Sequence, residues 1–560
     1  MGSLDILTVL LFAAGILFAG LLFARRGKDM KSFFAAGGSV PWQISGLSLY
    51  MGFFSAGTFV VWGSIAYLHG WVAVTIQWSM ALAGFAVGAL VAPRWHRTGV
   101  LTAAEYITRR LGLRVQKAYT YLFLLISLFT TGAFLYPVAK IVEVSTGLPL
   151  EACILLLGGV CILYVAAGGL WAVVVTDVLQ FIVLTAAVII VIPLALENAG
   201  GGLGRFFTDT PEDFFNLLSN EYTLPFVIAF GFYNAVFLGG NWAYVQRYTS
   251  VRTSRDARKV GYLFGGLYLI SPVLWMLPPM IYRAINPSLS GLESEGAYLM
   301  MCREALPPGM LGMMLGGMIF ATASSLNSTL NISSGVFTND IFKRLRPVST
   351  DRTLIRTARL STIGFGLLAI VVALLIPLMG GIVNVVISVA ALTGVPLYLP
   401  VIWSLFSSRQ TGMSILVSTL SGLAVNAFFK FAAPVLFGFG LDRAGEMMLG
   451  VGFPAAILLA FEIYYKVCGL RSPLYAPYRE WERQNNLEKQ AEAATAAATA
   501  QTGDDNRFSI RVIGTGVMLT GVVISLLGGF SGDGRSVVIT VGACLLLGGW
   551  FIRRRAKRQQ

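Results

Sequence analysis

The chain has 560 residues, of which 56% are hydrophobic and only 12% are charged. This balance excludes a water-facing globular protein for most of the length and indicates a polytopic membrane protein. The net charge of +14 does not indicate a nucleic-acid partner, because the Lys and Arg residues lie in short loops between apolar segments, as the positive-inside rule describes.

Apolar segments of about 20 residues, the length that crosses about 30 Å of hydrocarbon as a helix, recur along the chain. We therefore expect an all-α integral membrane protein with about 15 transmembrane helices. The predicted spans are 4–24, 43–69, 71–93, 115–141, 149–168, 171–197, 223–246, 259–284, 309–336, 357–379, 383–406, 412–437, 445–467, 510–530 and 536–552.

Basic clusters fall in alternate loops along this series of spans. "RRGKDMK", "RWHRTG" and the final "RRRAKRQQ" all lie on one side when the N-terminus is placed outside. The loops on the other side, such as "LESEGAYL", are acidic or weakly charged. The pattern predicts a multi-pass protein of the plasma (cell inner) membrane, with its N-terminus outside and its C-terminus in the cytoplasm.

Several classes of site have no support in the sequence. The five cysteines show neither a pairing pattern nor a metal-ligand spacing, and the two histidines are placed at predicted helix ends. No GxxxxGK[ST] loop occurs, which argues against an ATP-driven pump. No motif joins a nucleophile, a base and an orienting group, so we expect neither an enzyme nor an organic cofactor.

A polar stripe interrupts the predicted span 309–336 in the sequence "ATASSLNSTLN". Ala321, Ser324, Ser325 and Ser328 follow the spacing i, i+3, i+4 and i+7, so they share one helix face, which Asn327 flanks. One interpretation is close helix packing through small residues. The other is a cation site, because neutral hydroxyl and carbonyl oxygens are hard donors that bind an alkali ion without a buried fixed charge.

A cation shell of this kind needs free main-chain carbonyls from a second, interrupted helix. "GLSLYMGFFSAGTFVVWGSIAY" is a poor sequence for a continuous helix, because it has four glycines and a polar centre formed by Ser55 and Thr58. A similar interruption recurs in "FGFYNAVFLGGNWAYVQR". Paired broken spans in two halves are typical of inverted-repeat transporters with a site at the membrane midplane.

Five motifs in order resemble the sodium:solute symporter family over roughly residues 32–467. They are "SFFAAGGSVPW", "TAAEYITRRLG", "YVAAGGLWAVVVTDVLQ", "VQRYTSVRTSRDARK" and "ATASSLNSTLN" followed by "TNDIFKRL". The resemblance implies a leucine-transporter-type core of five plus five inverted-repeat helices, preceded by one helix and followed here by four. The implied division is 1–31 for the extra helix and its loop, 32–197 and 198–407 for the two core repeats, 408–467 for two peripheral helices, 468–508 for a cytoplasmic linker and 509–560 for two appended helices.

The resemblance also implies Na⁺ as the coupling ion. Carried over by motif, the principal sodium site uses Met51 and Phe54 of the broken helix with Ala321, Ser324 and Ser325 of the polar stripe. Some members of the family have a second sodium site, and the matching residues here are Asp177, Asn327 and Ser328. Asn327 stands where a hydroxyl is usual. The other interpretation of Asp177 is a residue at the inner helix end that reaches a hydrated cavity.

Family position places six residues around a small-molecule solute: Ser55, Thr58, Gln77, Asn234, Phe237 and Tyr268. Thr58, Gln77 and Tyr268 replace several of the acidic, amide and lysine side chains that sugar carriers of this family use. The set instead looks like that of acidic-sugar carriers. We expect sodium-coupled symport of a small organic anion, such as a monocarboxylate or a sugar acid, by alternating access.

Two alternatives stay open at this point. The first is a proton-coupled carrier on the same fold, and the second is a membrane protein that senses a solute without moving it. An ion channel has less support, because no repeated filter-like loop occurs in the sequence. The sequence carries no signal for an oligomeric state.

Overall fold

The structure is a computed structural model of the chain, and it describes residues 2–11, 14, 40–100, 102–164, 170–198, 202–346, 348–498, 501–529 and 534–558. These residues are almost entirely helical. The β-structure found among them is one isolated parallel bridge between Val40 and Val251.

The first half of the bundle runs from residue 42 to the loop after residue 198. Its helices are α3 (Trp42–Phe53), η2 (Thr58–Trp62), α4 (Gly63–His69), α5 (Val72–Leu90), α6 (Ala92–Thr98), α7 (Ala103–Leu111), α8 (Leu113–Thr146), α9 (Leu150–Tyr164) and α10 (Leu170–Asn198). Short helices α11 (Gly202–Thr208) and η3 (Glu212–Phe215) follow in the connecting loop.

The second half repeats the pattern. Its helices are α12 (Leu224–Gly240), α13 (Trp242–Thr249), α14 (Ser254–Ile285), η4 (Gly291–Gly296), α15 (Ala297–Ala305), α16 (Met310–Val336), η5 (Phe337–Phe342), α17 (Lys343–Leu345), α18 (Asp351–Leu375), η6 (Pro377–Met379), α19 (Ile382–Val389), η7 (Ala390–Gly394) and α20 (Val395–Phe406).

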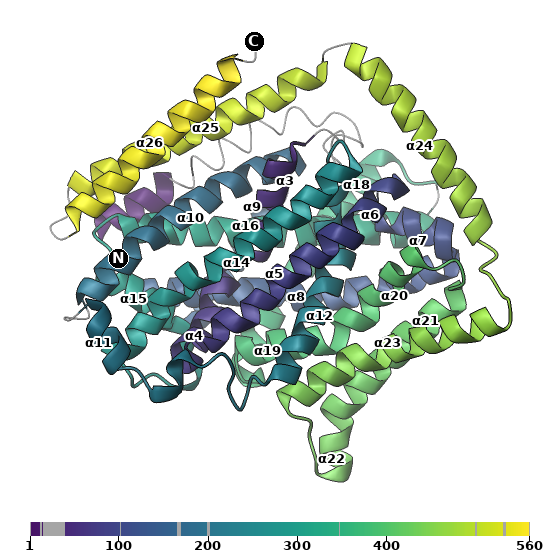
Figure 1. Cartoon of the computed structure of the whole chain (residues 1–560), viewed down its shortest axis with the longest axis horizontal. Coiled ribbons are helices and arrows are strands. Elements are labelled where there is room, and N and C mark those ends of the chain that lie inside the picture. The colour runs from purple at the N-terminus through teal and green to yellow at the C-terminus, as the bar shows by residue number, and fades with distance from the viewer. Residues whose placement is uncertain are drawn as a thin grey trace.

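Peripheral helices complete the chain. They are α21 (Gly412–Ala427), η8 (Phe428–Ala432), α22 (Ala433–Phe437), α23 (Arg443–Val467), α24 (Tyr475–Ala498), α25 (Gln501–Gly529) and α26 (Arg535–Arg558). The α25–α26 hairpin lies along one side of the bundle next to α10, and α24 runs along the adjacent edge (Figure 1).

Among the described residues, ten helices are long and apolar enough to cross a membrane, or up to twelve when each of two bent pairs counts as one span. The all-α membrane fold is therefore confirmed. The predicted total of about 15 spans stays a prediction, because most of the segment 4–24 lies outside the described residues and α9 and α16 have shorter apolar stretches, Leu150–Gly159 and Met310–Thr322.

Both predicted helix interruptions are present. The pair α3 and η2–α4 bends by 60° between Phe53 and Thr58. The pair α12 and α13 also bends by 60°, at Asn241, whose side-chain oxygen accepts the Ala243 N–H at 3.0 Å and so starts α13. The two bends occupy corresponding places in the two halves, as the inverted-repeat interpretation requires.

Small residues allow the core helices to approach closely. A Cβ atom added at Gly84 of α5 would lie 2.8 Å from the Gly265 nitrogen of α14, and one added at Gly88 would lie 3.0 Å from the Arg258 carbonyl. Backbone-to-backbone packing of this kind is how helices associate where lipid offers no hydrophobic driving force.

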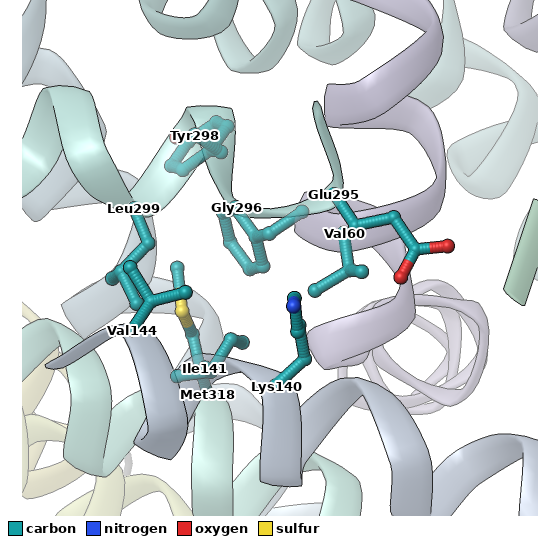
Figure 2. A pocket seen from close by; sticks show the side chains of 10 residues that line it. Val60, Lys140, Ile141, Val144, Glu295, Gly296, Tyr298, Leu299 and Met318 are labelled. Carbon is teal, nitrogen blue, oxygen red and sulfur yellow. The ribbon is translucent and has the colours of Figure 1, made fainter. Parts of the chain in front are cut away.

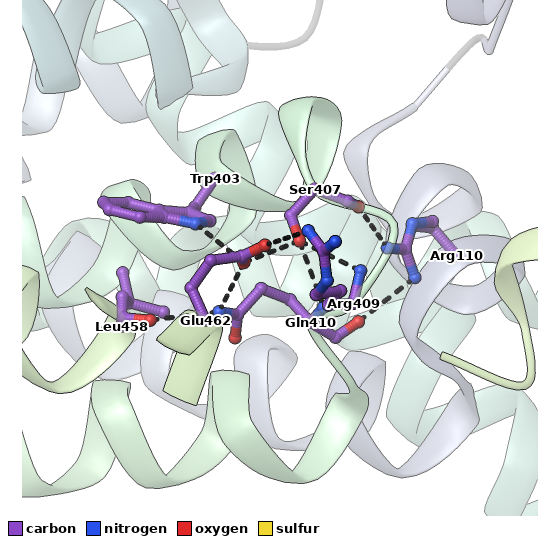
Figure 3. Close-up of polar contacts among 7 residues, drawn as sticks. All are labelled: Arg110, Trp403, Ser407, Arg409, Gln410, Leu458 and Glu462. Carbon is purple, nitrogen blue, oxygen red and sulfur yellow. Dashed lines mark hydrogen bonds and ion pairs between the residues drawn. The ribbon is translucent and has the colours of Figure 1, made fainter. Parts of the chain in front are cut away.

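The peripheral helices are fixed to the core by buried polar contacts (Figure 3). Arg110 of α7 is fully buried and donates to the carbonyls of Ser407 at 2.7 Å and Gln410 at 3.3 Å. Glu462 of α23 accepts from the Ser407 hydroxyl at 2.7 Å and from the Gln410 amide at 3.0 Å. The loop after α20 is therefore held from both sides, which positions α21 and α23 against the second half of the bundle.

The N-terminal segment contacts the start of α16. Residues 3–11 are helical, and the buried Asp5 carboxylate accepts the N–H groups of Gly309 at 2.7 Å and Gly312 at 3.2 Å. A carboxylate at this place satisfies the first amides of the helix and opposes the positive end of its dipole. The contact ties the chain start to the helix that carries the polar stripe.

Candidate functional site

The first bend has an unwound turn, Phe54–Gly57, in which Phe54 and Ser55 leave the helix and Ala56 and Gly57 begin the next helical segment. Phe54 takes an extended conformation with φ −93° and ψ 106°. Two hydroxyls then bind amides near the bend: the Ser55 N–H donates to Thr58 Oγ1 at 3.3 Å, and the Gly57 N–H donates to Ser55 Oγ at 3.2 Å. Side chains that bond the local backbone in this way compete with the helical pattern, so they fix the turn at this position.

The unwound turn touches the helix of the polar stripe. The Ala56 N–H donates to Thr322 Oγ1 of α16 at 2.8 Å, and both residues are fully buried. On the other side of the turn, the Met51 carbonyl accepts the Phe54 N–H at 3.1 Å. The two segments that the sequence predicts to share a cation are therefore in direct contact.

The predicted residues of the principal sodium site lie on the two sides of this contact. Met51, Phe54 and Ala321 are buried, with no more than 2% of each residue exposed. Ser325 is half-buried and its hydroxyl lies 3.5 Å from the Ala321 carbonyl. The side chain of Ser324 lies outside the described residues. The sodium assignment itself stays a prediction, and its donors are neutral oxygens of the type that suits an alkali ion.

Asp177, predicted for a second sodium site, lies in a buried polar cluster. Its Oδ2 atom accepts the Ser48 hydroxyl of α3 at 2.7 Å and lies 3.9 Å from Arg247 Nη2 of α13. The side chains of Asn327 and Ser328 lie outside the described residues. A cation at Asp177 would have to compete with the Arg247 guanidinium for the same carboxylate, and the second site stays a prediction.

A cavity of about 270 Å³ opens beside the unwound turn. This volume is close to the lower end of the roughly 300–1,000 Å³ range of small-molecule sites. Predicted solute-binding and ion-binding residues meet on its wall: Met51, Ser55, Thr58, Asp177, Asn234, Phe237, Tyr268 and Ser325. Phe54, Gln77 and Ala321 are not among the residues that line it.

Two amide side chains predicted for the solute site, Asn234 and Gln77, differ in their contacts. Asn234 of α12 lines the cavity and donates to Ser79 Oγ of α5 at 3.2 Å. Gln77 of α5 is only 3% exposed, and its Nε2 atom has no hydrogen-bond partner in the described structure. A buried amide donor without a partner is costly, so a ligand or water that accepts from it is favoured.

Aromatic rings form much of the cavity wall. Phe53 stacks on Tyr244 with ring centroids 4.2 Å apart, and Phe237 contacts Phe53 at 5.9 Å and Tyr398 at 5.6 Å. Tyr268 packs against Phe264 at 4.7 Å. The rings come from α3, α12, α13, α14 and α20, so both halves of the bundle enclose the same space.

Sequence reasoning missed three residues of this region. Thr322 stands beside the polar stripe in "ATASS", where it has a hydroxyl between two alanines, Ala321 and Ala323. Ser48 belongs to "GLSLY", where it is a polar side chain inside an otherwise apolar stretch, and Arg247 is the charged residue in "VQRYT" at the end of a predicted span. That feature is a usable signal, because polar groups at membrane depth need partners.

Among the described residues, no group of three or more His, Cys, Asp or Glu side chains is placed to hold a metal ion. The only charged residues on the described cavity wall are Asp177 and Arg247, and they pair with each other. Apart from this pair, the described wall consists of hydroxyls, amides, main-chain groups and aromatic rings, which are groups that can bind a solute or an alkali ion.

Comparison with known proteins gives a consistent result. The model of the sodium:solute symporter family matches residues 33–422. The chain is 24% identical over 471 residues to the sodium/sialic acid symporter NanT of Aliivibrio fischeri, covering 81% of this chain and 93% of that protein. It is 27% identical over 470 residues to the sodium/glucose cotransporter of Vibrio parahaemolyticus, covering 76% and 85%.

A solved structure shares the fold. A Na⁺-coupled sialic acid symporter in a substrate-bound outward-open state superposes with a TM-score of 0.69 at 21% identity, covering 83% of this chain and 98% of that one. The leucine-transporter-type fold predicted from the motifs is thereby confirmed. Because the family model spans most of the chain, the chain belongs to the sodium:solute symporter family.

Proposed function

We propose that the protein couples the entry of Na⁺ to the uptake of a small organic anion, with an acidic sugar as the favoured class. Sodium-coupled symport follows from family membership, and the anion is our inference from the cavity. The ion is assigned to Met51, Phe54, Ala321, Ser324 and Ser325, and the solute to Ser55, Thr58, Gln77, Asn234, Phe237 and Tyr268.

One observation carries the coupling. The unwound turn contributes Ser55 to the cavity wall and, through Ala56, contacts Thr322 next to the proposed sodium residues. Ion and solute would therefore act on the same short backbone segment, in which Phe54 is assigned to the ion and Ser55 to the solute. An ion that orders this turn lowers the entropic cost of binding the solute, which is positive coupling without a relay between distant sites.

The charge of the cavity supports an anion. Its described wall has no acidic side chain free to repel a carboxylate, since Asp177 contacts Ser48 and Arg247. On the wall, the hydroxyls of Ser55 and Thr58 can donate to carboxylate oxygens, whereas the Gln77 amide, which does not line the cavity in this structure, would do so only in the loaded carrier. An anion that moves with Na⁺ also presents little net charge to the low-dielectric core, so the loaded carrier crosses at lower cost.

The relatives are named for solutes of two different classes. NanT is named for sialic acid, an acidic sugar, whereas the relative from Vibrio parahaemolyticus is named for glucose, a neutral one. The identities of 24% and 27% do not separate these classes. The proposal therefore depends on the cavity residues rather than on the relatives.

Uptake into liposomes that contain the purified protein tests the proposal. Labelled sialic acid, glucose and lactate are offered under an inward Na⁺ gradient, an inward proton gradient or neither. We expect accumulation of an acidic solute only with Na⁺, and its collapse when an ionophore dissipates the gradient. Proton-driven accumulation would establish the alternative coupling, and binding without accumulation would establish a sensor. Accumulation of glucose alone would refute the anion assignment.

Sidedness is the second part of the proposal. We place the basic loops in the cytoplasm of a plasma-membrane protein, with the N-terminus outside and the C-terminus inside, because the positive-inside rule assigns them there. Single cysteines introduced in the loops after α6 and after α15, in a variant without native cysteines, should react with a membrane-impermeant reagent only from the inside and only from the outside, respectively. The reverse pattern would invert the topology.

A further inference from the structure

Thr322 has a hydrogen-bonding arrangement that sets it apart from the polar stripe beside it. Its hydroxyl donates to the Met318 carbonyl of its own helix at 3.0 Å. This fixes the hydroxyl proton, so the remaining lone pairs of Oγ1 are directed away from that carbonyl, and one of them accepts the Ala56 N–H at 2.8 Å. Thr322 is 0% exposed, so water is not a competing acceptor.

The bond replaces one that a continuous helix would contain. In an α-helix the Ala56 N–H would donate to the Gly52 carbonyl, four residues earlier. Here the Gly52 carbonyl faces the phenol of Tyr244 on α13, at 3.5 Å. The donor of this helical hydrogen bond, the Ala56 N–H, thus bonds to α16. The acceptor, the Gly52 carbonyl, contacts α13 of the second bent pair.

The energetic consequence follows from burial. A buried main-chain N–H without a partner is destabilising, so loss of the Thr322 hydroxyl would destabilise the unwound turn and favour the helical bond from Ala56 to Gly52 instead. Thr322 therefore selects between two backbone states of the first bend. Its neighbour in sequence, Ala321, and Ser325 one turn later are the residues assigned to the ion.

We propose that Thr322 is a positioning residue for sodium coupling: it holds the unwound turn Phe54–Gly57 against α16 and so pre-forms the ion site without touching the ion. This inference rests on the proposed function. The hydrogen bond between Thr322 and Ala56 orders the turn before the ion binds, so the ion does not have to supply the free energy of ordering it. This is preorganisation of the site. Loss of the acceptor lowers sodium affinity, because part of the binding energy then goes to ordering the turn.

The test uses the full chain in nanodiscs and Na⁺ alone as the probe. Thr322→Val removes the acceptor and keeps the shape, Thr322→Ser keeps the acceptor, and Thr322→Cys has a weak acceptor at the size of Ser. Thr362→Val is the matched control, because Thr362 of α18 bonds only within its own helix, to Ala358 at 2.9 Å. NaCl replaces KCl at constant ionic strength while the melting temperature and the hydrogen exchange of peptides over residues 51–58 are followed.

We call the Na⁺ concentration that gives half of the maximal rise in melting temperature the sodium midpoint. We expect it to be about tenfold higher in the Val and Cys variants, since the free energy of one hydrogen bond corresponds to about a tenfold change in affinity. Exchange over the unwound turn should be faster in both, and the Ser and Thr362→Val proteins should match the wild type. A sodium midpoint unchanged in both Val and Cys, or raised equally in Ser, would overturn the inference. A wild-type protein without any response to Na⁺ would instead overturn the proposed function.

A merely structural role for Thr322 gives a different pattern. The melting temperature would then fall by the same amount in NaCl and in KCl, and the sodium midpoint would stay in place. If the Val variant does not fold, the comparison of Ser with Cys decides the question alone.

Discussion

The carboxylate of Asp177 on α10 lies 3.9 Å from Nη2 of Arg247 on α13, with 5% and 7% of the two side chains exposed. The Ser48 hydroxyl of α3 donates to the same carboxylate at 2.7 Å and accepts from Arg247 Nε at 3.3 Å. Three helices, including parts of both bent pairs, therefore meet at one buried charge pair on the cavity wall.

Removal of one charge of this pair should destabilise the protein strongly. Asp177→Asn leaves the Arg247 guanidinium unpaired in a low-dielectric environment, which costs about 3–5 kcal/mol for a buried pair. The double variant Asp177→Asn, Arg247→Gln should lose much less than the sum of the two single losses. Chemical or thermal unfolding of the purified proteins measures the three values.

The control for this comparison of single and double variants is the exposed ion pair of Arg205 on α11 and Asp209 after it. Their side chains are 58% and 36% exposed. Asp209→Asn should change stability far less than Asp177→Asn does, because exposed ion pairs contribute little to stability. Additive losses from Asp177 and Arg247 would contradict the pairing.

Ser325→Ala, and Ser324→Ala beside it, should each raise the Na⁺ concentration that gives half-maximal uptake. A contact to an ion is worth about 1.5–3 kcal/mol, so a tenfold or larger rise is expected. Ser361→Ala on α18 is the matched control, because its hydroxyl bonds only to carbonyls of its own helix at 2.9 and 3.0 Å. Sodium dependence unchanged in both stripe variants would remove these serines from the ion site.

Gln77→Ala should weaken the binding of the solute more than the binding of the ion. Its buried Nε2 atom has no partner, so the bond to a bound carboxylate would be made only in the loaded carrier, and its loss should raise the KM of uptake by roughly tenfold. Thr58→Ala should act in the same direction. Gln484→Ala on the exposed face of α24 is the control. A larger effect on the sodium midpoint than on KM would misplace the solute cavity.

The position of the first bend shows what the sequence could and could not predict. The glycine content of residues 46–63 correctly indicated a broken helix. Yet Gly46, Gly52 and Gly63 lie in helical turns, where an added Cβ would lie 2.7–3.2 Å from Leu263, Tyr244 and Tyr298. These glycines serve helix packing. The break itself is set by hydroxyls, which bind the backbone only once the helix has opened.

Contacts across the fold explain the residues that sequence reasoning missed. Thr322 and Ala56 are 266 positions apart, and Arg247 and Ser48 are 199 apart. A periodicity argument assigns a residue to a helix face, but it does not say which main-chain amide will be free on the facing helix. The family motifs placed Asp177 near the ion, whereas its pairing with Arg247 depends on the bend at Asn241 that turns α13 toward α10.

Glu295 leads to a prediction at the opposite end of the bundle. It is 4% exposed on η4, where its carboxylate accepts the Tyr136 hydroxyl of α8 and the Ile382 N–H at the start of α19, both at 2.9 Å. Glu295 and Lys140 line the same pocket of about 10 Å³ (Figure 2), and the Lys140 amine pairs with Glu143 at 2.8 Å.

Burial raises the pKa of the Glu295 carboxyl, and the Glu143 charge adds to the increase, while the bonds from Ile382 and Tyr136 and the Lys140 charge act against it. An acid whose pKa is raised on folding binds protons more tightly in the native state. Its contribution to stability is therefore full below the ordinary glutamate pKa and is lost as the pH rises through the raised value.

The melting temperature of the wild type minus that of Glu295→Gln should accordingly fall as the pH increases from acidic values through the raised pKa, because glutamine does not titrate. Melting curves in detergent at constant ionic strength measure this difference. Glu293→Gln, an equal charge change at an exposed position of the same short helix, should give a much flatter difference. If the Glu295→Gln curve stayed parallel to the wild type across that range, the buried carboxyl would not titrate as its surroundings require.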